Sequence, residues 1–406
     1  MLNGEAGPGA AFAMRVLASF ATAVGARSLI GIGGSHIDGC LYHGQASLDF
    51  VERFVASGAR VRVPTTLNVG SLDLIHPDLV RMPAADAEPS RRLMQAHLDL
   101  GCQPSFTCAP YQSLFRPRLG DQVAWGESNA IVFANSVIGA RTARYGDFID
   151  LCCAVTGRAP AWSLHLDEHR LGQVLFRLTG FPASLPASDG LFVAVGLIVG
   201  ARCGDHVPVI QGLPDPGAED RLKALGAAAA SSGSVALFHA VGITPEAPDL
   251  AAALGGREPM AELDITPADV SAALARLSSV PDGAPLAAIC LGTPHFSLPE
   301  WRRLAAALSH AGPCRAPIYV NTARETLRQV RSDPALSRML AQGVTPVVDT
   351  CTYITPILRD AEGAVMTNSG KWAHYAPGNL GVQVAFGDLA ECVASAVAGR
   401  VVRGMG

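Results

Sequence analysis

The sequence predicts an α/β protein with mainly parallel sheets, and two observations indicate it. The composition is apolar and rich in glycine but poor in aromatic residues: of 406 residues, 49% are hydrophobic, 42 are Gly and 6% are aromatic. Short apolar runs alternate with polar loops and with segments of helical spacing. Strands covered by helices on both faces have this character. The chain is too long for one core, so two or three domains are expected.

The first part of the chain alternates helices and strands. Residues 10–25 have the spacing of an amphipathic helix, and residues 28–32 read as a buried strand. A second helix is predicted over residues 46–57, a second strand over 59–63 and a third helix around 90–104.

The remainder repeats the pattern. A helix with Pro267 in its first turn is predicted over residues 266–277. Apolar runs predict strands over residues 196–200, 286–291, 317–320 and 345–348. We expect divisions at about 1–150, 151–285 and 286–395, with a C-terminal tail over residues 396–406.

Charge and cysteine content exclude several classes of protein. The net charge is −4 without a run of Lys or Arg, which argues against a nucleic-acid footprint or an anionic membrane surface. No apolar run reaches the roughly 18 residues of a membrane span, and no signal peptide is recognisable. The ten cysteines are scattered rather than dense. We therefore expect a cytoplasmic protein with free thiols.

Polar loops follow several of the predicted strands. The Gly-rich loop over residues 33–45 contains His36 and Asp38, which either serve function or cap the next helix. The next loop carries small neutral hydrogen-bonding residues that suit a polar substrate, although helix capping accounts for part of them: Thr65, Thr66, Asn68 and Ser71. Glu127, Ser128 and Asn129 open an apolar helix, and ordinary capping explains them equally well.

The stretch over residues 345–378 is the strongest candidate for an active-site rim. A short apolar run ends in Asp349–Tyr353, and a second polar edge follows with Asn368, Ser369, Lys371 and His374. Ligands of open α/β sheets lie beyond the carboxyl ends of strands. The alternative is a Ser/Thr-rich turn with a buried cysteine.

Known short motifs are weak or absent. Residues 165–169, HLDEH, match a zinc-protease pattern that puts two imidazoles on one helix face, but nothing around them supports a metal site. The Gly370–Lys371 pair departs from a phosphate-binding loop, because Val365 and Trp372 replace its required residues. No dinucleotide fingerprint is found.

Three cysteines share one context. Cys108, Cys290 and Cys351 each lie at a polar loop or a predicted strand edge. Thiolates from distant loops can converge on an iron–sulfur cluster, and three ligands would leave one iron open as a Lewis acid. No CxxC spacing is present, so the sequence alone does not establish a cluster.

Six ordered segments resemble the aconitase X family, and they extend over nearly the whole chain. They are GSHIDGCLYHG, RVRVPTTLNVGSLDL, WGESNAIVFANSVIGART, ICLGTPHFSLPE, VVDTCTYITP and TNSGKWAHYAPG. The resemblance implies a hydro-lyase with three aconitase-like α/β domains around a central cleft. It also implies an iron–sulfur cluster, of the 2Fe-2S or 4Fe-4S type or reduced to mononuclear iron on purification, with ligands at Cys108, Cys290 and Cys351.

The family has a fourth, swivelling domain that this sequence does not contain, so we expect it on a separate small subunit. Family members dehydrate cis-3-hydroxy-L-proline to 1-pyrroline-2-carboxylate or, alternatively, dehydrate 5-phosphomevalonate. The motif loops hold few cations, which favours hydroxyproline over a phosphorylated substrate. A non-enzymatic cluster-based sensor or RNA binder would need a basic patch, which is missing.

The resemblance and the loops together give a set of candidate residues. Lys371 is expected to pair with the substrate carboxylate, and Ser369 is a candidate base, although the base serine of aconitases belongs to the swivelling domain. His36 completes the catalytic candidates. Substrate binding is expected from Thr65, Thr66, Asn68, Ser71, Glu127, Ser128, Asn129, His295, Asn368 and His374.

Overall fold

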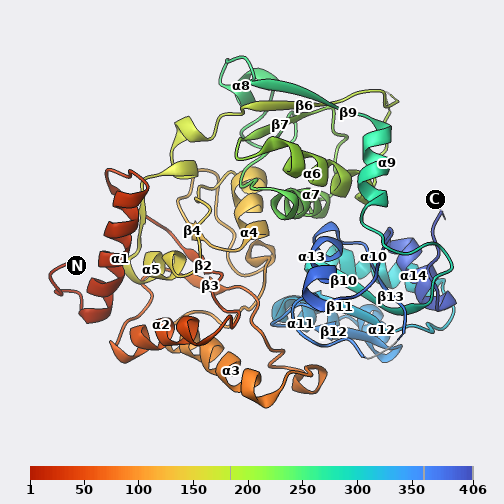
Figure 1. Cartoon of the computed structure of the whole chain (residues 1–406), viewed down its shortest axis with the longest axis horizontal. Helices are drawn as coiled ribbons and strands as arrows, with labels where there is room; N and C mark the ends of the chain where they lie inside the picture. The colour runs from red at the N-terminus through yellow and green to blue at the C-terminus, as the bar shows by residue number, and fades with distance from the viewer. Residues whose placement is uncertain (183, 360–361, 405–406) are drawn as a thin grey trace.

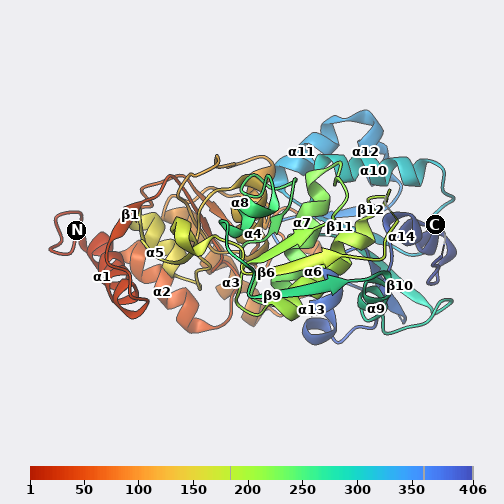
Figure 2. The same cartoon turned by 90° about the horizontal axis from the view of Figure 1, so that it is seen from above.

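The computed structural model describes residues 1–182, 184–359 and 362–404. It contains three successive α/β units: the N-terminal unit (residues 8–160), the middle unit (174–275) and the C-terminal unit (286–398). The N-terminal unit lies on one side of the molecule, and the other two lie one above the other on the opposite side (Figures 1 and 2). In the described part of the chain, no helix is long and apolar enough to cross a membrane.

The N-terminal unit is built on a parallel sheet in the order β3-β2-β4. Its strands are β2 (Ser35–Ile37), β3 (Thr65–Leu67) and β4 (Ala124–Trp125). A separate antiparallel ribbon pairs β1 (Leu29–Gly31) with β5 (Arg158–Pro160). The helices are α1 (Pro8–Ala23), α2 (Gln45–Ala56), α3 (Ala84–Asp99), α4 (Ser128–Phe133) and α5 (Ile149–Thr156). There are also two 3₁₀ turns, η1 (Pro77–Leu79) and η2 (Pro110–Gln112), and a π-helical segment, η3 (Ala134–Ile138), that continues α4.

One predicted strand of this unit is wrong, because residues 59–63 form no strand. The strand predicted over residues 28–32 is present as the short β1, but it is partly exposed rather than buried. The sheet strands β2 and β3 lie instead in the two segments predicted as polar loops. They are polar yet buried because their side chains bond within the sheet: Ser35 Oγ donates to the Ala124 carbonyl at 2.7 Å, and His36 Nδ1 lies 2.8 Å from Thr66 Oγ1.

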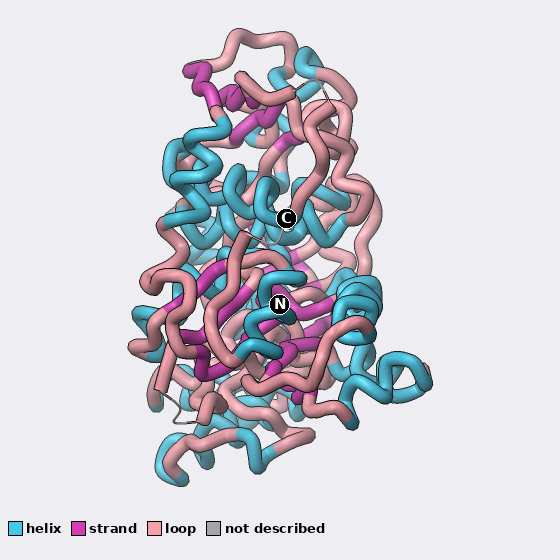
Figure 3. Tube along the Cα trace, turned by 90° about the vertical axis from the view of Figure 1, so that its right-hand side faces the viewer, coloured by secondary structure: helices cyan, strands magenta, loops and turns pink. Residues whose placement is uncertain are grey.

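The middle unit is a parallel sheet in the order β8-β7-β6-β9. Figures 1 and 3 show α6 and α7 between this sheet and the rest of the molecule. Its strands are β6 (Val174–Leu178), β7 (Pro208–Gln211), β8 (His239–Ala240) and β9 (Ala261–Ile265). Its helices are α6 (Asp189–Cys203), α7 (Glu219–Ser232), α8 (Leu250–Leu254) and α9 (Pro267–Ala275), preceded by the turns η4 (Ser163–His165) and η5 (Asp167–His169).

The strand predicted over residues 196–200 is part of helix α6. A helix that is apolar on all sides is a buried helix, and such a run cannot be distinguished from a strand by its apolar character. The two glycines allow α7 to approach closely. A Cβ at Gly196 would lie 2.3 Å from the Leu225 carbonyl oxygen, and one at Gly200 would lie 2.4 Å from that of Ala229.

The C-terminal unit is a five-stranded parallel sheet in the order β12-β11-β10-β13-β14. Its strands are β10 (Leu286–Phe296), β11 (Ile318–Thr322), β12 (Val344–Val347), β13 (Ala364–Thr367) and β14 (Val384–Phe386). Its helices are α10 (Leu298–Ser309), α11 (Arg324–Ser332), α12 (Pro334–Ala341), α13 (Gly370–Leu380) and α14 (Leu389–Ala398). The α/β class with mainly parallel sheets is thus confirmed.

The units share packing at their boundaries. The core of the N-terminal unit continues to Ala159, so the expected division at residue 150 falls inside α5. An apolar cluster joins Val193 and Ala228 of the middle unit to Trp372 of the C-terminal unit. The N-terminal and C-terminal units meet where Asp73, in the loop after β3, accepts from the Val348 N–H after β12 at 3.0 Å, and where Thr107 Oγ1 lies 2.9 Å from His295 Nδ1 near the end of β10. The candidate site lies at this junction.

Candidate active site

Two of the predicted cysteines meet at one histidine. Cys108 precedes η2, Cys351 follows β12, and both are buried. The main-chain N–H of His295 donates to Cys108 Sγ at 3.3 Å, and its ring Nε2 lies 3.5 Å from Cys351 Sγ. Burial and the neighbouring Cys108 thiol raise the pKa of Cys351 well above its usual value. The Cys351 thiol is therefore protonated unless a cation binds it.

The imidazole of His295 is fixed and neutral. Its Nδ1 lies 2.9 Å from Thr107 Oγ1, and its Nε2 lies 3.4 Å from the Thr350 carbonyl oxygen. Burial lowers the pKa of His295 to about 4. The side chain, predicted only as a substrate contact, thus lies beside Cys351, while the main chain of the same residue contacts Cys108.

The Cys351 loop is tied to the N-terminal unit. Asp349 has a φ of 63°, a left-handed conformation that is uncommon for a residue other than glycine. Its carboxylate accepts from Arg324 Nε at 2.5 Å and from the Leu74 N–H at 3.2 Å. Asp73 accepts from the Val348 N–H at 3.0 Å. These bonds hold the loop in position across the boundary between the two units.

Cys290 lies inside a strand and not at its edge. The predicted strand ended at residue 291, but β10 continues to Phe296. The Cys290 thiol is buried in an apolar cluster and bonds to Thr352, the neighbour of Cys351. Within the described ranges, no three His, Cys, Asp or Glu side chains come together around a space for a metal ion.

Lys371 and Glu127 form a buried ion pair between the C-terminal and N-terminal units. Lys371 Nζ lies 2.5 Å from Glu127 Oε1, and the two side chains are 6% and 5% exposed. Burial alone would raise the pKa of Glu127, but the Lys371 ammonium outweighs it and lowers the pKa. Glu127 also caps α4 by accepting from the Ala130 N–H at 2.7 Å, and Ser128 Oγ lies 3.3 Å from Lys371 Nζ.

His36 and Asn68 present polar atoms that have no protein partner. Burial lowers the pKa of His36 to about 4, so its ring is neutral, and its Nε2 is buried without a hydrogen bond. Asn68 Nδ2 donates to Asp38 Oδ1, and Asn68 Oδ1 is left without a partner. Burial and the nearby Glu127 carboxylate raise the pKa of Asp38 to about 7.

The sequence leaves Asp38 as either a functional residue or a helix cap, and it is not in the final set of candidate site residues. It directly follows β2, so the rule that ligands lie beyond strand ends would have identified it had that strand been recognised.

The other neutral candidates differ in how their polar atoms are used. Asn129 Nδ2 donates to the Cys108 carbonyl and to the Tyr111 hydroxyl, each at 3.0 Å, and its Oδ1 is unpartnered. Thr65 Oγ1 donates to the Val63 carbonyl at 2.8 Å, whereas Ser71 Oγ accepts from the Tyr42 N–H at 2.9 Å. Thr65, Thr66 and Ser71 therefore support the loops, while Asn68 and Asn129 have free acceptors.

The candidates near the start of α13 differ in their surroundings: three line a cavity and one is exposed. Ser369 caps the helix by accepting from the Trp372 N–H at 3.0 Å, and its hydroxyl donates to the Thr293 carbonyl. Asn368, Ser369 and Lys371 line one small cavity with the end of β10. His374 lies exposed on α13 against the Tyr375 ring, with ring centroids 4.9 Å apart.

The HLDEH segment does not form the helix that its zinc pattern requires. It consists of the turns η4 and η5, with His169 exposed. The two nitrogens of His165 lie 2.5 Å from the Tyr145 hydroxyl and 2.6 Å from Gln122 Oε1. His165 is thus a bonded core residue.

Comparison with known proteins identifies relatives over the whole chain. A cis-3-hydroxy-L-proline dehydratase of Pseudomonas aeruginosa is 44% identical over 100% of this chain, which covers 70% of that protein; one of Hypocrea jecorina is 39% identical over 98%, covering 67%. A phosphomevalonate dehydratase large subunit of Methanosarcina mazei is 33% identical over 98% of this chain and 96% of its own length.

Structures and family models agree with these relatives. The holo-form crystal structure of Thermococcus kodakaraensis aconitase X superposes with a TM-score of 0.86 at 29% identity, covering 97% of each chain. The models of the first, second and third aconitase X domains match residues 1–168, 172–275 and 286–398. The resemblance carried by the six motifs is confirmed: the chain belongs to the aconitase X family and is a dehydratase of the hydro-lyase class.

Proposed function

We propose that the chain dehydrates cis-3-hydroxy-L-proline. The reaction removes the C2 proton and the C3 hydroxyl as water, and the resulting enamine tautomerises to 1-pyrroline-2-carboxylate. The dehydratases that are 44% and 39% identical to the chain carry this substrate in their names, whereas the phosphomevalonate relative is 33% identical.

The choice of substrate rests on one observation: the Lys371 ammonium is neutralised by a buried carboxylate. Lys371 is already paired with the Glu127 carboxylate, so the pair has no net charge to offer a phosphate. Free carbonyl acceptors on Asn68 and Asn129 suit a ligand that brings hydrogen-bond donors. A zwitterion with a secondary ammonium meets both conditions, whereas a phosphate brings mainly acceptors.

The family suggests an iron–sulfur cluster, and the residues present fit an iron centre at two positions. Cys108 and Cys351 are buried soft donors that both contact His295, and a bound cation would remove the cost of ionising Cys351. The resemblance to the family proposes Cys290 as the third ligand. His295 is the alternative third ligand, because it contacts both Cys108 and Cys351. When bound, such a centre supplies an open iron that makes the C3 hydroxyl a better leaving group.

The chain's own residues bind and orient in this proposal. Lys371 keeps its bond to Glu127 and donates one further hydrogen bond to the substrate carboxylate, which needs a donor but less charge than a phosphate. Asn68 and Asn129 accept from the ring ammonium. His36 contributes its buried, unpartnered Nε2 as a further polar contact. The hydroxyl of Ser369 is engaged by Thr293, which supports an assisting role rather than that of the base.

We propose that a swivelling domain on a separate small subunit closes the site and supplies the base. The Methanosarcina mazei relative of similar length is named a large subunit, while the Pseudomonas aeruginosa dehydratase is longer than the part this chain matches. Closure of a mobile domain completes a catalytic arrangement, and loss of a general base typically costs a factor of about 10² to 10⁴.

The test follows 1-pyrroline-2-carboxylate formation by the anaerobically purified chain with and without its small subunit, with 5-phosphomevalonate as the competing substrate. Turnover of hydroxyproline that saturates at one small chain per large chain is expected. Turnover of phosphomevalonate alone would reverse the choice of substrate. Full turnover without the partner would place the base in this chain.

Iron content and colour test the ligands separately. Cys108→Ser and Cys351→Ser should each bleach the protein and abolish turnover, while Cys152→Ser and Cys314→Ser should not. Cys290→Ser and His295→Ala are compared for the third position. If either of these two variants retains full iron content and activity, the residue replaced in it is not a ligand.

A further inference from the structure

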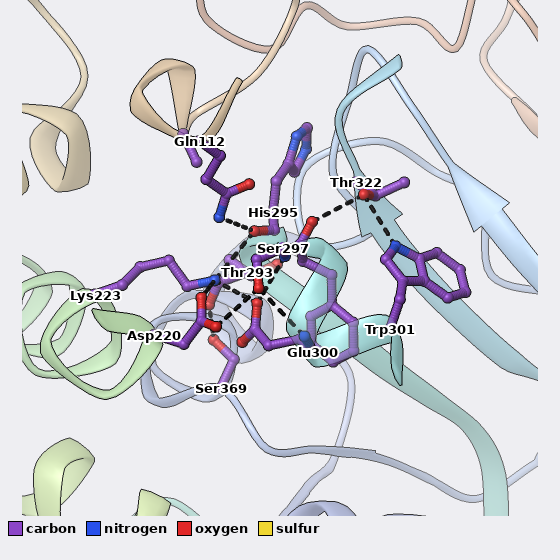
Figure 4. Close-up of polar contacts among 12 residues, drawn as sticks. Gln112, Asp220, Lys223, Thr293, His295, Ser297, Glu300, Trp301, Thr322 and Ser369 are labelled. Atoms are coloured by element: carbon purple, nitrogen blue, oxygen red, sulfur yellow. Dashed lines mark hydrogen bonds and ion pairs between the residues drawn. The ribbon is translucent and has the colours of Figure 1, made fainter. Parts of the chain in front are cut away.

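The main chain of His295 is held by all three units. Its carbonyl oxygen accepts from Gln112 Nε2 of the N-terminal unit at 3.1 Å and from Lys223 Nζ of the middle unit at 3.3 Å (Figure 4). On the other side of the same residue, the N–H and the ring face Cys108 and Cys351. The main chain of His295, which contacts one of the two thiols, is therefore fixed by hydrogen bonds to its carbonyl oxygen on the opposite side.

Lys223 is itself held by two carboxylates from different units. Its ammonium lies 2.9 Å from Asp220 Oδ1 on α7 and is ion-paired with Glu300 on α10, and its side chain is 2% exposed. Burial would lower the pKa of Lys223, but the two carboxylates outweigh it, so the ammonium is charged. It cannot move away from His295 without separating a buried pair.

The same carboxylates fix the segment that follows His295. Ser297 Oγ donates to Asp220 Oδ2 at 2.8 Å, and the Ser297 N–H donates to Glu300 Oε2 at 2.8 Å in a capping box that starts α10. Figure 4 shows these contacts converging on the turn between β10 and α10. The cluster of Lys223, Asp220, Glu300 and Ser297 thus sets the place of the turn relative to the middle unit.

We propose that Lys223 is a positioning residue for the iron centre: by fixing the His295 main chain, it holds the Cys108 loop and the Cys351 loop at the spacing that ligation needs. The proposal rests on the proposed role of these two thiols. It assigns to the middle unit, which provides neither thiol, a part in building the site.

The experiment compares Lys223→Met and Lys223→Met/Glu300→Gln with the wild-type chain. The double variant removes one of the two carboxylates that lose their cation, and the other, Asp220, keeps the Ser297 hydroxyl as a donor. Lys223→Arg tests rescue. Glu219→Gln is the control, because Glu219 neighbours Asp220 but forms an exposed ion pair with Arg116. Folding is checked by melting temperature and circular dichroism.

Two readouts are independent of turnover. In the anaerobically purified chains, bound iron and its thiolate-to-iron absorption should fall several-fold in both Met variants and return in Lys223→Arg. In the metal-free chains, alkylation of Cys108 and Cys351, followed by mass spectrometry, should become at least about tenfold faster, as expected when a local opening becomes easier by one decade. Buried Cys152 and the Glu219→Gln chain should keep their wild-type rates.

Wild-type iron content, absorption and thiol protection in a folded Lys223→Met/Glu300→Gln chain would overturn the proposal. Equal acceleration at Cys152 would also overturn it, because that result marks general loosening. If the wild-type chain binds no iron at all, the ligand proposal fails, whereas the alkylation comparison still decides the role of Lys223.

Discussion

Replacing Lys371 by methionine tests the buried pair with Glu127. At their 2.5 Å separation, an effective dielectric constant of about 20 gives a Coulomb attraction of about 7 kcal/mol. Withdrawing each ion from water costs several kcal/mol, so the intact pair is worth much less than this. Lys371→Met removes the attraction but leaves the Glu127 carboxylate buried, and such a loss typically costs about 3–5 kcal/mol.

The penalty should depend on pH. In the wild-type chain the pKa of Glu127 is lowered from its ordinary value of 4.5, so the stability it contributes is present above that value and is lost as the pH falls through the folded-state pKa. Without Lys371, burial dominates and the pKa rises above 4.5. The variant then loses stability as the pH rises through this raised value. The difference between the two chains should be small at low pH and largest at neutral pH.

Melting temperatures of the metal-free chains between pH 5 and 8 measure this. At about 2–4 °C per kcal/mol, we expect Lys371→Met to melt about 6 to 20 °C lower at pH 7. Glu127→Gln/Lys371→Met should recover more than half of the loss, since glutamine keeps an acceptor for the Ala130 N–H. Unchanged melting at pH 7, a pH-independent deficit, or a double variant no better than the single one would refute the reasoning.

Three further predictions concern other buried contacts. His165→Ala should lower the melting temperature, because the Tyr145 hydroxyl loses its buried partner, without loss of metal on elemental analysis; stoichiometric zinc that disappears in the variant would contradict this. Gly196→Leu should cost about 1–3 kcal/mol or more in denaturant unfolding, because α7 leaves no room for the side chain. Arg324→Met should destabilise the chain less as the pH falls, since the pKa of Asp349 is already raised by burial and its carboxyl can then take up a proton; a pH-independent loss would argue against it.

The sequence identified the loops of the site better than its strands. The prediction placed Thr66 and His36 in polar loops, but both lie in buried strands because they bond to each other across the sheet. Periodicity of apolar residues cannot reveal a strand whose buried side chains are polar and mutually satisfied. The error does not move the candidate site, since the segments predicted as functional loops contain β2 and β3 and the residues that follow them.

Pairings between distant segments were beyond sequence reasoning. Glu127 was explained equally well as an ordinary cap, and Lys371 was assigned to substrate. The structure shows that Glu127 does cap α4 and that the same carboxylate also neutralises Lys371. Cys290 shows a further limit of sequence reasoning. The predicted strand ends at residue 291, whereas β10 continues to Phe296, so the Cys290 thiol lies inside the strand and not at its edge.

The location of the site at the junction of the units follows from its chemistry. A buried ion pair and the buried polar groups of His295 would destabilise any single small core, because each group needs a partner. Here those partners come from another unit: Lys371 of the C-terminal unit neutralises Glu127 of the N-terminal unit, and Lys223 of the middle unit holds His295. Folding of each unit alone therefore leaves these groups without partners. The contacts that stabilise the docked units are the same contacts that assemble the site.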